Sequence, residues 1–111
     1  MKRTLTALTV AATMFTSSAY AFDPDDLQKL KDINECYQCD LSGADLNGAD
    51  LSENDLSGAD LSGARLAKAD LRDTNLSGAK LLEADLTGAI MNGAILCNTT
   101  MPDGSVIYSD C

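Results

Sequence analysis

Four cysteines are the side chains best suited to chemistry in this 111-residue chain, which has no histidine and no tryptophan. Cys36 and Cys39 form a Cys-x-x-Cys motif, a spacing found in thiol–disulfide redox pairs and in short structural disulfides. A zinc site is disfavoured, because histidine ligands are absent and the other two cysteines, Cys97 and Cys111, lie far along the chain. The motif alone leaves the redox pair and the structural disulfide open as hypotheses.

A second group of chemical interest is a series of aspartates at five-residue intervals, interrupted once at Arg65: Asp40, Asp45, Asp50, Asp55, Asp60 and Asp70. A solvated acidic surface of this kind keeps strand edges from joining other sheets. A calcium site would need a ligand loop that these spacings do not match. We therefore predict no metal ligands among these residues.

No set of residues in the chain predicts catalysis. Histidine is absent, and no serine has a neighbouring base that would make it a nucleophile. The isolated serines recur at one repeated surface position: Ser42, Ser52, Ser57, Ser62 and Ser77. We expect a protein that is not an enzyme and that needs no cofactor.

These residues are positioned by twelve consecutive five-residue units that run from Cys39 to Asn98. Each unit has a large apolar residue at its centre, here called position i: Leu41, Leu46, Leu51, Leu56, Leu61, Leu66, Leu71, Leu76, Leu81, Leu86, Met91 and Leu96. A small residue, usually alanine, lies at position i−2. A period of five fits neither a helix nor a strand, whose periods are about 3.6 and 2.0. It predicts a solenoid, in which each unit buries its apolar residue by stacking on other units.

The units Ala44–Gly48 and Ala59–Gly63 resemble the A(D/N)LXX consensus of the pentapeptide-repeat family, in its small exported bacterial members. The resemblance implies an all-β fold, a right-handed quadrilateral β-helix with four units in each turn and therefore about three coils. It implies no shared activity. The departures from the consensus are Asn54 and Thr74 at the alanine position, and Arg65, Lys80, Ile90 and Ile95 at the Asp/Asn position.

The implied coil also bears on the cysteines. Cys39 and Cys97 would lie at opposite ends of a body about 14 Å tall, since strands stack at about 4.8 Å. A disulfide accepts a Cα–Cα separation of up to about 7 Å. We therefore favour Cys36–Cys39 and Cys97–Cys111, and peptide mapping would distinguish this pairing from a Cys39–Cys97 link. Because Cys39 takes an inward i−2 position, a structural disulfide is favoured over a redox pair.

The segments on either side of the repeats are predicted to close the coil. Residues 22–38 are expected to hold a capping helix and a Cys-x-x-Cys linker. Asp23 can cap a helix of about Pro24 to Asn34, with proline at a favoured first position. The apolar face of this helix is predicted to contain Leu27, Leu30 and Ile33. Residues 99–111 are expected to form a C-terminal cap or tail.

Three apolar residues of the last turn occupy positions that should face solvent: Leu82, Ile90 and Ile95. Exposed apolar clusters are uncommon in monomers. Either the tail folds back over these residues, or they form an interaction patch for a second copy or another protein.

Residues 1–21 have the pattern of a secretory signal peptide. The apolar run Leu5–Phe15 is followed by Ala19-Tyr20-Ala21, a small-x-small cleavage signal. Cleavage after Ala19 and an uncleaved anchor are alternatives, although the apolar run is short for a membrane span. We expect a secreted, periplasmic protein with no membrane insertion after cleavage.

Beyond residue 21 the chain is strongly acidic. Without Lys2 and Arg3 it has 6 basic and 17 acidic side chains, a net charge of −11. Such a charge disfavours nucleic-acid phosphates and anionic membranes as partners. The length allows one small domain.

We expect a non-enzymatic exported protein, a structural or protein-interaction module of the cell envelope. The resemblance implies an alternative, because some family members mimic a DNA duplex and inhibit DNA gyrase. The export signal, the short rod and the basic residues Arg65, Arg72 and Lys80 argue against it. A third hypothesis is an envelope thiol–disulfide role through Cys36 and Cys39.

Overall fold

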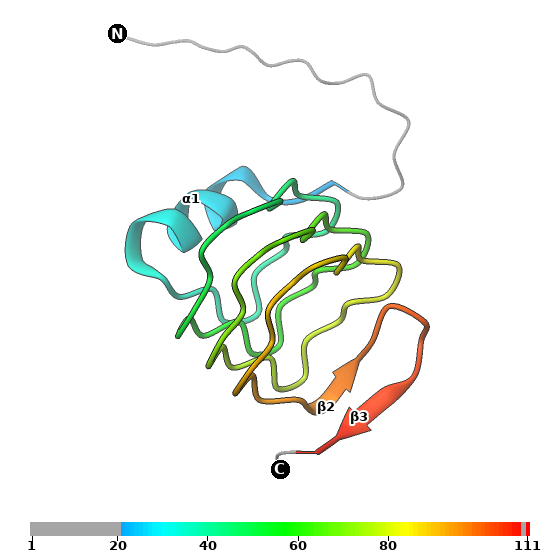
Figure 1. Cartoon of the computed structure of the whole chain (residues 1–111). Coiled ribbons are helices and arrows are strands. Elements are labelled where there is room, and N and C mark those ends of the chain that lie inside the picture. The colour runs from blue at the N-terminus through cyan, green and yellow to red at the C-terminus, as the bar shows by residue number, and fades with distance from the viewer. Residues whose placement is uncertain (1–20, 110) are drawn as a thin grey trace, which may run out of the picture.

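The computed structural model describes residues 21–109 and 111 of the chain. Within these residues, one helix, α1 (Pro24–Ile33), comes first, and two strands, β2 (Cys97–Thr100) and β3 (Val106–Tyr108), come last. Between them the backbone winds into a stack of coils, with α1 at one end and the β2–β3 hairpin at the other (Figure 1). The predicted signal peptide, residues 1–21, lies outside the described residues except for its last residue.

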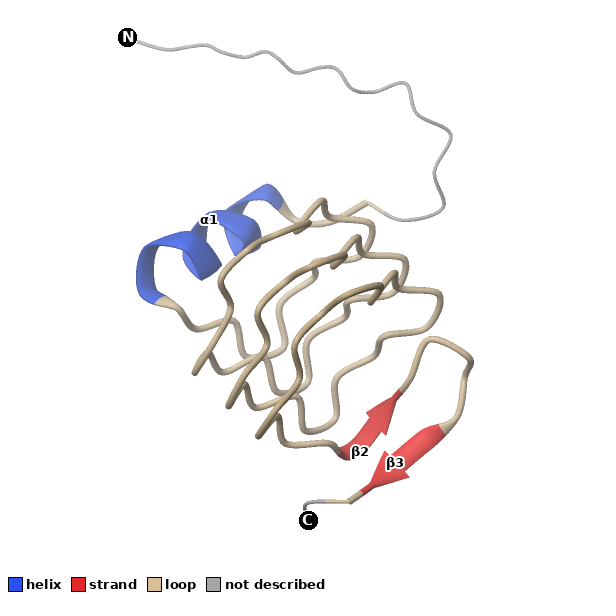
Figure 2. Cartoon of the chain, viewed as in Figure 1, coloured by secondary structure: helices blue, strands red, loops and turns tan. Residues whose placement is uncertain are grey.

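The stack of coils is held together by parallel bridges between residues twenty apart. The described part of the chain forms ten such bridges, from Glu35↔Asp55 to Lys80↔Thr100. One turn of the backbone therefore takes four five-residue units, and each unit forms one side of the turn. Because the bridges are isolated, the coil appears as loop rather than as strand arrows in Figure 2. The bridged region begins at Glu35 and reaches Thr100, so it extends beyond the expected limits of 39–98.

A tight turn at every corner allows the chain to follow this path. In the unit centred on Leu41, the backbone N–H of Ala44 donates to the carbonyl oxygen of Leu41 at 3.0 Å. Gly43, between them, has a φ of 72°. Such a turn requires a positive φ at this position, which glycine adopts without steric cost.

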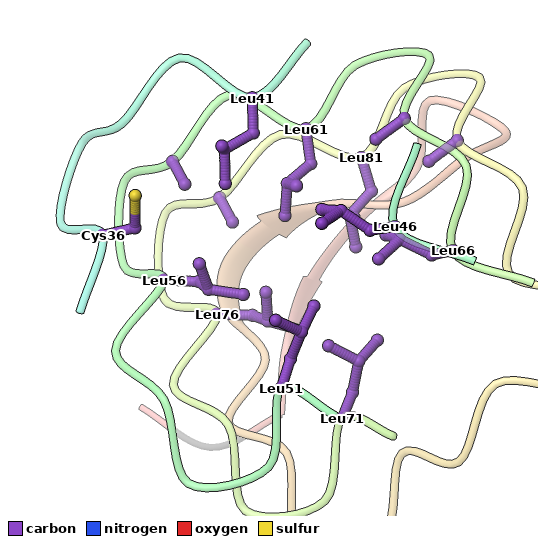
Figure 3. Close-up of a cluster of buried hydrophobic side chains, with 14 of the residues drawn as sticks. Cys36, Leu41, Leu46, Leu51, Leu56, Leu61, Leu66, Leu71, Leu76 and Leu81 are labelled. Carbon is purple, nitrogen blue, oxygen red and sulfur yellow. The ribbon is translucent and has the colours of Figure 1, made fainter. Parts of the chain in front are cut away.

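Leucine side chains fill the interior, as Figure 3 shows for the labelled centres from Leu41 to Leu81. Seven of them are completely buried: Leu41, Leu56, Leu61, Leu66, Leu71, Leu76 and Leu81. Each contributes about 1.5–3 kcal/mol relative to an exposed leucine. The ladder of centres therefore supplies the main stabilising contribution of the coil.

The helix α1 begins and ends at clear signals. The Asp23 carboxylate accepts the N–H of Asp25 at 2.9 Å, and Asn34 ends the helix with a φ of 58°. Leu30 is 2% exposed, whereas Ile33 is 55% exposed. The expectation that Ile33 belongs to the buried face is therefore wrong. Residues advance by about 100° in a helix, so Ile33 lies about 120° from Leu27 around the axis.

Two hydrogen bonds attach the start of α1 to the first coil. The Asp23 N–H donates to the carbonyl oxygen of Asp40 at 2.9 Å. In return, the Asp40 N–H donates to the Asp26 carboxylate at 2.8 Å. At the other end, β2 and β3 pair antiparallel, with Thr99 opposite Ile107 and an irregularity next to Cys97.

Candidate functional site

The first cysteine pair forms a disulfide inside the coil. Cys36 and Cys39 are bonded, with their Cα atoms 5.1 Å apart, and they are 0% and 2% exposed. Cys36 takes the place of a central leucine in the column above Leu56, so its unit belongs to the coil rather than to a linker. The Cys36 sulfur lies 3.2 Å from the carbonyl oxygen of Asp26 in α1. Thiol exchange needs an accessible sulfur, and this burial favours a structural disulfide over a redox pair.

The second cysteine pair lies at the surface of the C-terminal end. Cys97 and Cys111 are bonded, with their Cα atoms 4.9 Å apart. Cys97 begins β2 and is half-buried, whereas Cys111 is exposed. This disulfide ties the end of the chain to the last coil and closes the loop that contains β3.

The aspartates at position i−1 form local hydrogen bonds that shape the coil. The Asp50 carboxylate accepts both the N–H of Ser52 at 3.1 Å and its hydroxyl at 2.6 Å. The N–H bond recurs with Asp40, Asp45, Asp55, Asp60, Asp70, Asn75 and Asp85 as acceptors. Aspartate and asparagine side chains commonly stabilise turns in this way. The serines and aspartates of the repeat therefore have a structural role, which the Asp-x-Ser spacing could have indicated.

These hydrogen bonds lower the pKa of several carboxyl groups. The hydroxyl and then the N–H of Ser52 hold the pKa of Asp50 below its usual value of 3.8. Thr87 does the same for Asp85, to which Arg65 adds a smaller effect. The pKa of Asp70 is lowered chiefly by the Arg72 side chain, which lies 2.6 Å from it. Hydrogen bonds to the ionised form are the common cause.

The predicted column of alternating charge is present in the coil. The backbone of Arg65 forms parallel β-bridges with Asp45 in one neighbouring coil and with Asp85 in the other, so the three side chains lie in one column. All three side chains are exposed, and such pairs contribute at most a few tenths of a kcal/mol. The column is therefore a minor stabilising feature of the surface.

The three outward apolar residues are exposed, but they are not gathered on one face. Leu82, Ile90 and Ile95 are 42%, 45% and 36% exposed. Ile90 and Ile95 lie in successive units and thus on adjacent sides of the coil. Leu82 lies two units before Ile90, on the opposite side, close to Gly104 of the tail. The candidate patch therefore reduces to Ile90 and Ile95.

The C-terminal end adds further apolar surface to these two residues. The last-coil centres are only half-buried, namely Leu86, Met91 and Leu96. Among residues 21–109 and 111, no backbone acceptor pairs with the N–H of Leu86 or Gly88, although the equivalent groups one coil earlier are paired. An apolar end with open backbone donors is a surface on which another chain can pack or pair.

In the sequence, Asn54 stands out only as a departure from alanine at position i−2. The structure places it inside the coil, 4% exposed, beside a pocket under α1. A polar residue at an inward position was the signal that could have drawn attention to it.

In the described part of the chain, residues 21–109 and 111, the side chains and helices bear on metal sites and membrane spans. No group of three or more histidine, cysteine or acidic side chains is arranged to hold a metal ion there. In the same residues, no helix has the length and apolar character needed to cross a membrane.

The parallel bridges, corner turns and leucine ladder together define a β-helical solenoid of five-residue units. The chain matches the Pentapeptide repeats family in eight copies, over residues 35–73 and 64–101. This match covers more than half of the chain, so the chain belongs to the pentapeptide repeat family, and the predicted resemblance is confirmed. Membership supports a repeat-built structural or interaction module.

Several solved structures are similar to the chain. A pentapeptide repeat protein from the thylakoid lumen of Arabidopsis thaliana is 33% identical, with 66% of this chain and 48% of that one covered and a TM-score of 0.43. HetL from the cyanobacterium Nostoc, involved in heterocyst differentiation regulation, is 30% identical, with 66% and 51% covered and a TM-score of 0.34. Another Nostoc pentapeptide repeat protein is 26% identical, with 75% and 82% covered and a TM-score of 0.30. The chain thus spans about half the length of the first two. No curated protein shows a significant match.

Proposed function

We propose that this protein is a non-catalytic scaffold, exported to the cell envelope, that binds another protein chain at the C-terminal end of its coil. About three right-handed coils form the body, and α1 caps the N-terminal end. Family membership supports the scaffold role. The signal pattern of residues 1–21 supports export, because it has the apolar run and cleavage signal of secreted proteins.

The observation that carries the proposal is the incomplete closure of the last coil. Ile90 and Ile95 are exposed, Leu86 and Met91 are half-buried, and the N–H of Leu86 has no backbone partner in the described part of the chain. Thirteen of the 17 acidic side chains lie before residue 74, in the segment of α1 and in the earlier coils. A protein partner that covers this end would bury apolar side chains and add hydrogen bonds to the open backbone edge.

The test uses the double variant Ile90→Asp plus Ile95→Asp, with Ile33→Asp as the matched control. Ile33 is exposed on α1 at the other end and is 55% exposed. Crosslinking in the native envelope should recover a partner with the wild type and the control but not with the double variant. Light scattering of the purified proteins shows whether that partner is a second copy. Equal crosslinking by all three proteins would contradict the proposal, as would a double variant that fails through lost stability.

Stacking of acidic side chains favours a second candidate, an inhibitor that mimics DNA. The bridges place Asp40 beside Asp60 and Asp50 beside Asp70. The same columns continue into Lys80 and Ile90, so the acidic rows are short. A supercoiling assay with DNA gyrase tests this function, and inhibition at micromolar protein would support it over the scaffold role.

A further inference from the structure

A pocket of about 280 Å³ lies between α1 and the first coil, at the end of the molecule opposite to Ile90 and Ile95. Leu30 of α1 and Leu46 and Leu51 of the coil form its apolar wall, and all three are nearly buried. Figure 3 shows Leu46 and Leu51 pointing into the coil. Such walls suit the apolar part of a small ligand.

The pocket also contains a buried amide without a partner. Asn54 lines it and is 4% exposed, yet its side chain forms no hydrogen bond with any residue in the described ranges 21–109 and 111. A buried amide that forms no hydrogen bond costs free energy, and native proteins usually satisfy such groups. The arrangement points to a ligand that supplies the missing hydrogen bond.

At the equivalent position one coil later, the polar side chain forms a hydrogen bond. Thr74 lies twenty residues after Asn54, and its hydroxyl donates to the carbonyl oxygen of Leu51 at 2.7 Å. That acceptor lies 23 residues before Thr74. The same offset from Asn54 leads to Lys31, which belongs to α1 rather than to a coil. The amide of Asn54 therefore faces the place where a preceding coil is missing and the pocket takes its space.

Opposite charges lie on the rim of this pocket. Lys31 and Asp50 both line it, and Lys31 has no acidic group within 4.0 Å among the described residues. Ser52 donates its hydroxyl and its N–H to the same Asp50 oxygen, Oδ1, and leaves Oδ2 available. A ligand complementary to the whole pocket would carry an apolar body, a negative group and a positive group.

We infer that this pocket binds a small aliphatic zwitterion, of the class of aliphatic α-amino acids. The aliphatic side chain lies on Leu46 and Leu51. The carboxylate accepts from the Asn54 amide and faces Lys31, and the ammonium group faces Asp50. This inference concerns the N-terminal end and is independent of the proposed partner at the C-terminal end.

Nuclear magnetic resonance titration of the isotope-labelled full chain with leucine tests the inference. Three matched probes each lack one feature: isocaproate has no ammonium group, isoamylamine has no carboxylate, and glycine has no aliphatic side chain. Leucine should shift the amide signals of residues 30–34 and 46–54 and the side-chain amide of Asn54. It should bind about tenfold more tightly than each matched probe, the effect of one hydrogen-bonded charge or its equivalent.

Asn54→Ala and Thr74→Ala provide the matched variants. Alanine is the usual residue at this position of the repeat, so both variants should fold. Asn54→Ala should bind leucine about tenfold more weakly without loss of thermal stability, since it removes an unpaired amide. Thr74→Ala should lose stability and keep wild-type binding. The inference is overturned if leucine shifts no pocket signal at tens of millimolar, if all probes act alike, or if Asn54→Ala binds as well as the wild type.

Discussion

Different elements lie at the two ends of the coil. At the N-terminal end, α1 lies over the first coil, and the centres beneath it, Leu46 and Leu51, are 5% and 4% exposed. At the C-terminal end, β2 and β3 run beside the last coil, and the centres Leu86 and Met91 remain half-buried. Figure 1 shows the helix and the hairpin at opposite ends of the stack. The coil is therefore well covered at one end and accessible at the other.

The difference follows from how each element satisfies its backbone. A helix forms its hydrogen bonds internally, so α1 can offer Leu30 to the coil as an apolar face. β3 forms its hydrogen bonds with β2, and the N–H of Met101 donates to the carbonyl oxygen of Ser105. That carbonyl lies nineteen residues after Leu86, where the repeat pattern would place the acceptor for the Leu86 N–H. The hairpin thus closes on itself and leaves part of the last coil uncovered.

The largest effect should come from truncating one centre at each end of the same column. Leu51 and Met91 are both in the column that contains Leu71. Leu51→Ala should lower the free energy of unfolding by about 3 kcal/mol, because a buried leucine is lost and a cavity remains. Met91→Ala should cost about 1 kcal/mol, because Met91 is already half in water. Chemical denaturation measures both, and equal losses would show that the two ends are covered alike.

The second contrast concerns the disulfides. Replacing Cys97 and Cys111 by alanine opens a loop of about fifteen residues and should cost up to about 3 kcal/mol in the chain-entropy view. Hydrogen exchange should show the loss of protection confined to residues 97–108. Replacing Cys36 and Cys39 opens a shorter loop, worth about 2 kcal/mol in the same view, but it also removes two buried side chains. Its effect should therefore spread through α1 and the first coil, and exchange confined to residues 36–39 would contradict this.

Much of this architecture could be predicted from the sequence, because the five-residue period is a local signal. The inward leucines, the glycine corners and the start of α1 at Asp23 and Pro24 all follow from residue type and spacing. The unit that contains Cys36 was missed because cysteine replaces the central leucine. Its membership of the coil depends on the backbone bridge from Glu35 to Asp55.

The candidate site could be predicted less well, because it depends on which sides of the coil carry each residue and on how the ends fold. Counting units in groups of four would have separated Leu82 from Ile90. No local pattern indicates that the hairpin leaves Leu86 and Met91 half-buried. The pocket at Asn54 likewise depends on where α1 lies, which tertiary contacts through Asp26 and Leu30 determine.

A smaller effect should come from the attachment of α1. Asp26→Ala removes the acceptor of the Asp40 N–H and should lower the free energy of unfolding by about 1–2 kcal/mol, the cost of leaving that group unpaired. Asp25→Ala is the matched control. Asp25 is exposed and acts only through the first turn of the helix, so its loss should cost about 0.3 kcal/mol. If the two variants were equally stable, the contact between α1 and the coil would contribute nothing, and the contrast between the ends would weaken.

The smallest effect is acid sensitivity, which should be the same at the two ends. Hydrogen bonds from Ser52 and Ser105 hold the pKa of Asp50, near α1, and of Asp103, in the C-terminal turn, below 3.8. A carboxyl group whose pKa is lower in the folded state than in the unfolded state stabilises the fold at every pH above its unfolded-state pKa. That contribution is lost as the pH falls below 3.8 and through the folded pKa.

Nuclear magnetic resonance titration of the two carboxyl carbons measures these pKa values directly. Ser52→Ala should raise the pKa of Asp50 alone, and Ser105→Ala that of Asp103 alone, since each serine acts on its own carboxylate. Asp50→Asn should keep the turn and lose the acid dependence, because Asn75 already accepts the N–H of Ser77 without titrating. A pKa of 3.8 or above for either aspartate would show that its turn is not held by the carboxylate. If the pKa were lowered for only one of the two aspartates, the two ends would differ in the hydrogen bonds of their turns as well as in the burial of their apolar side chains.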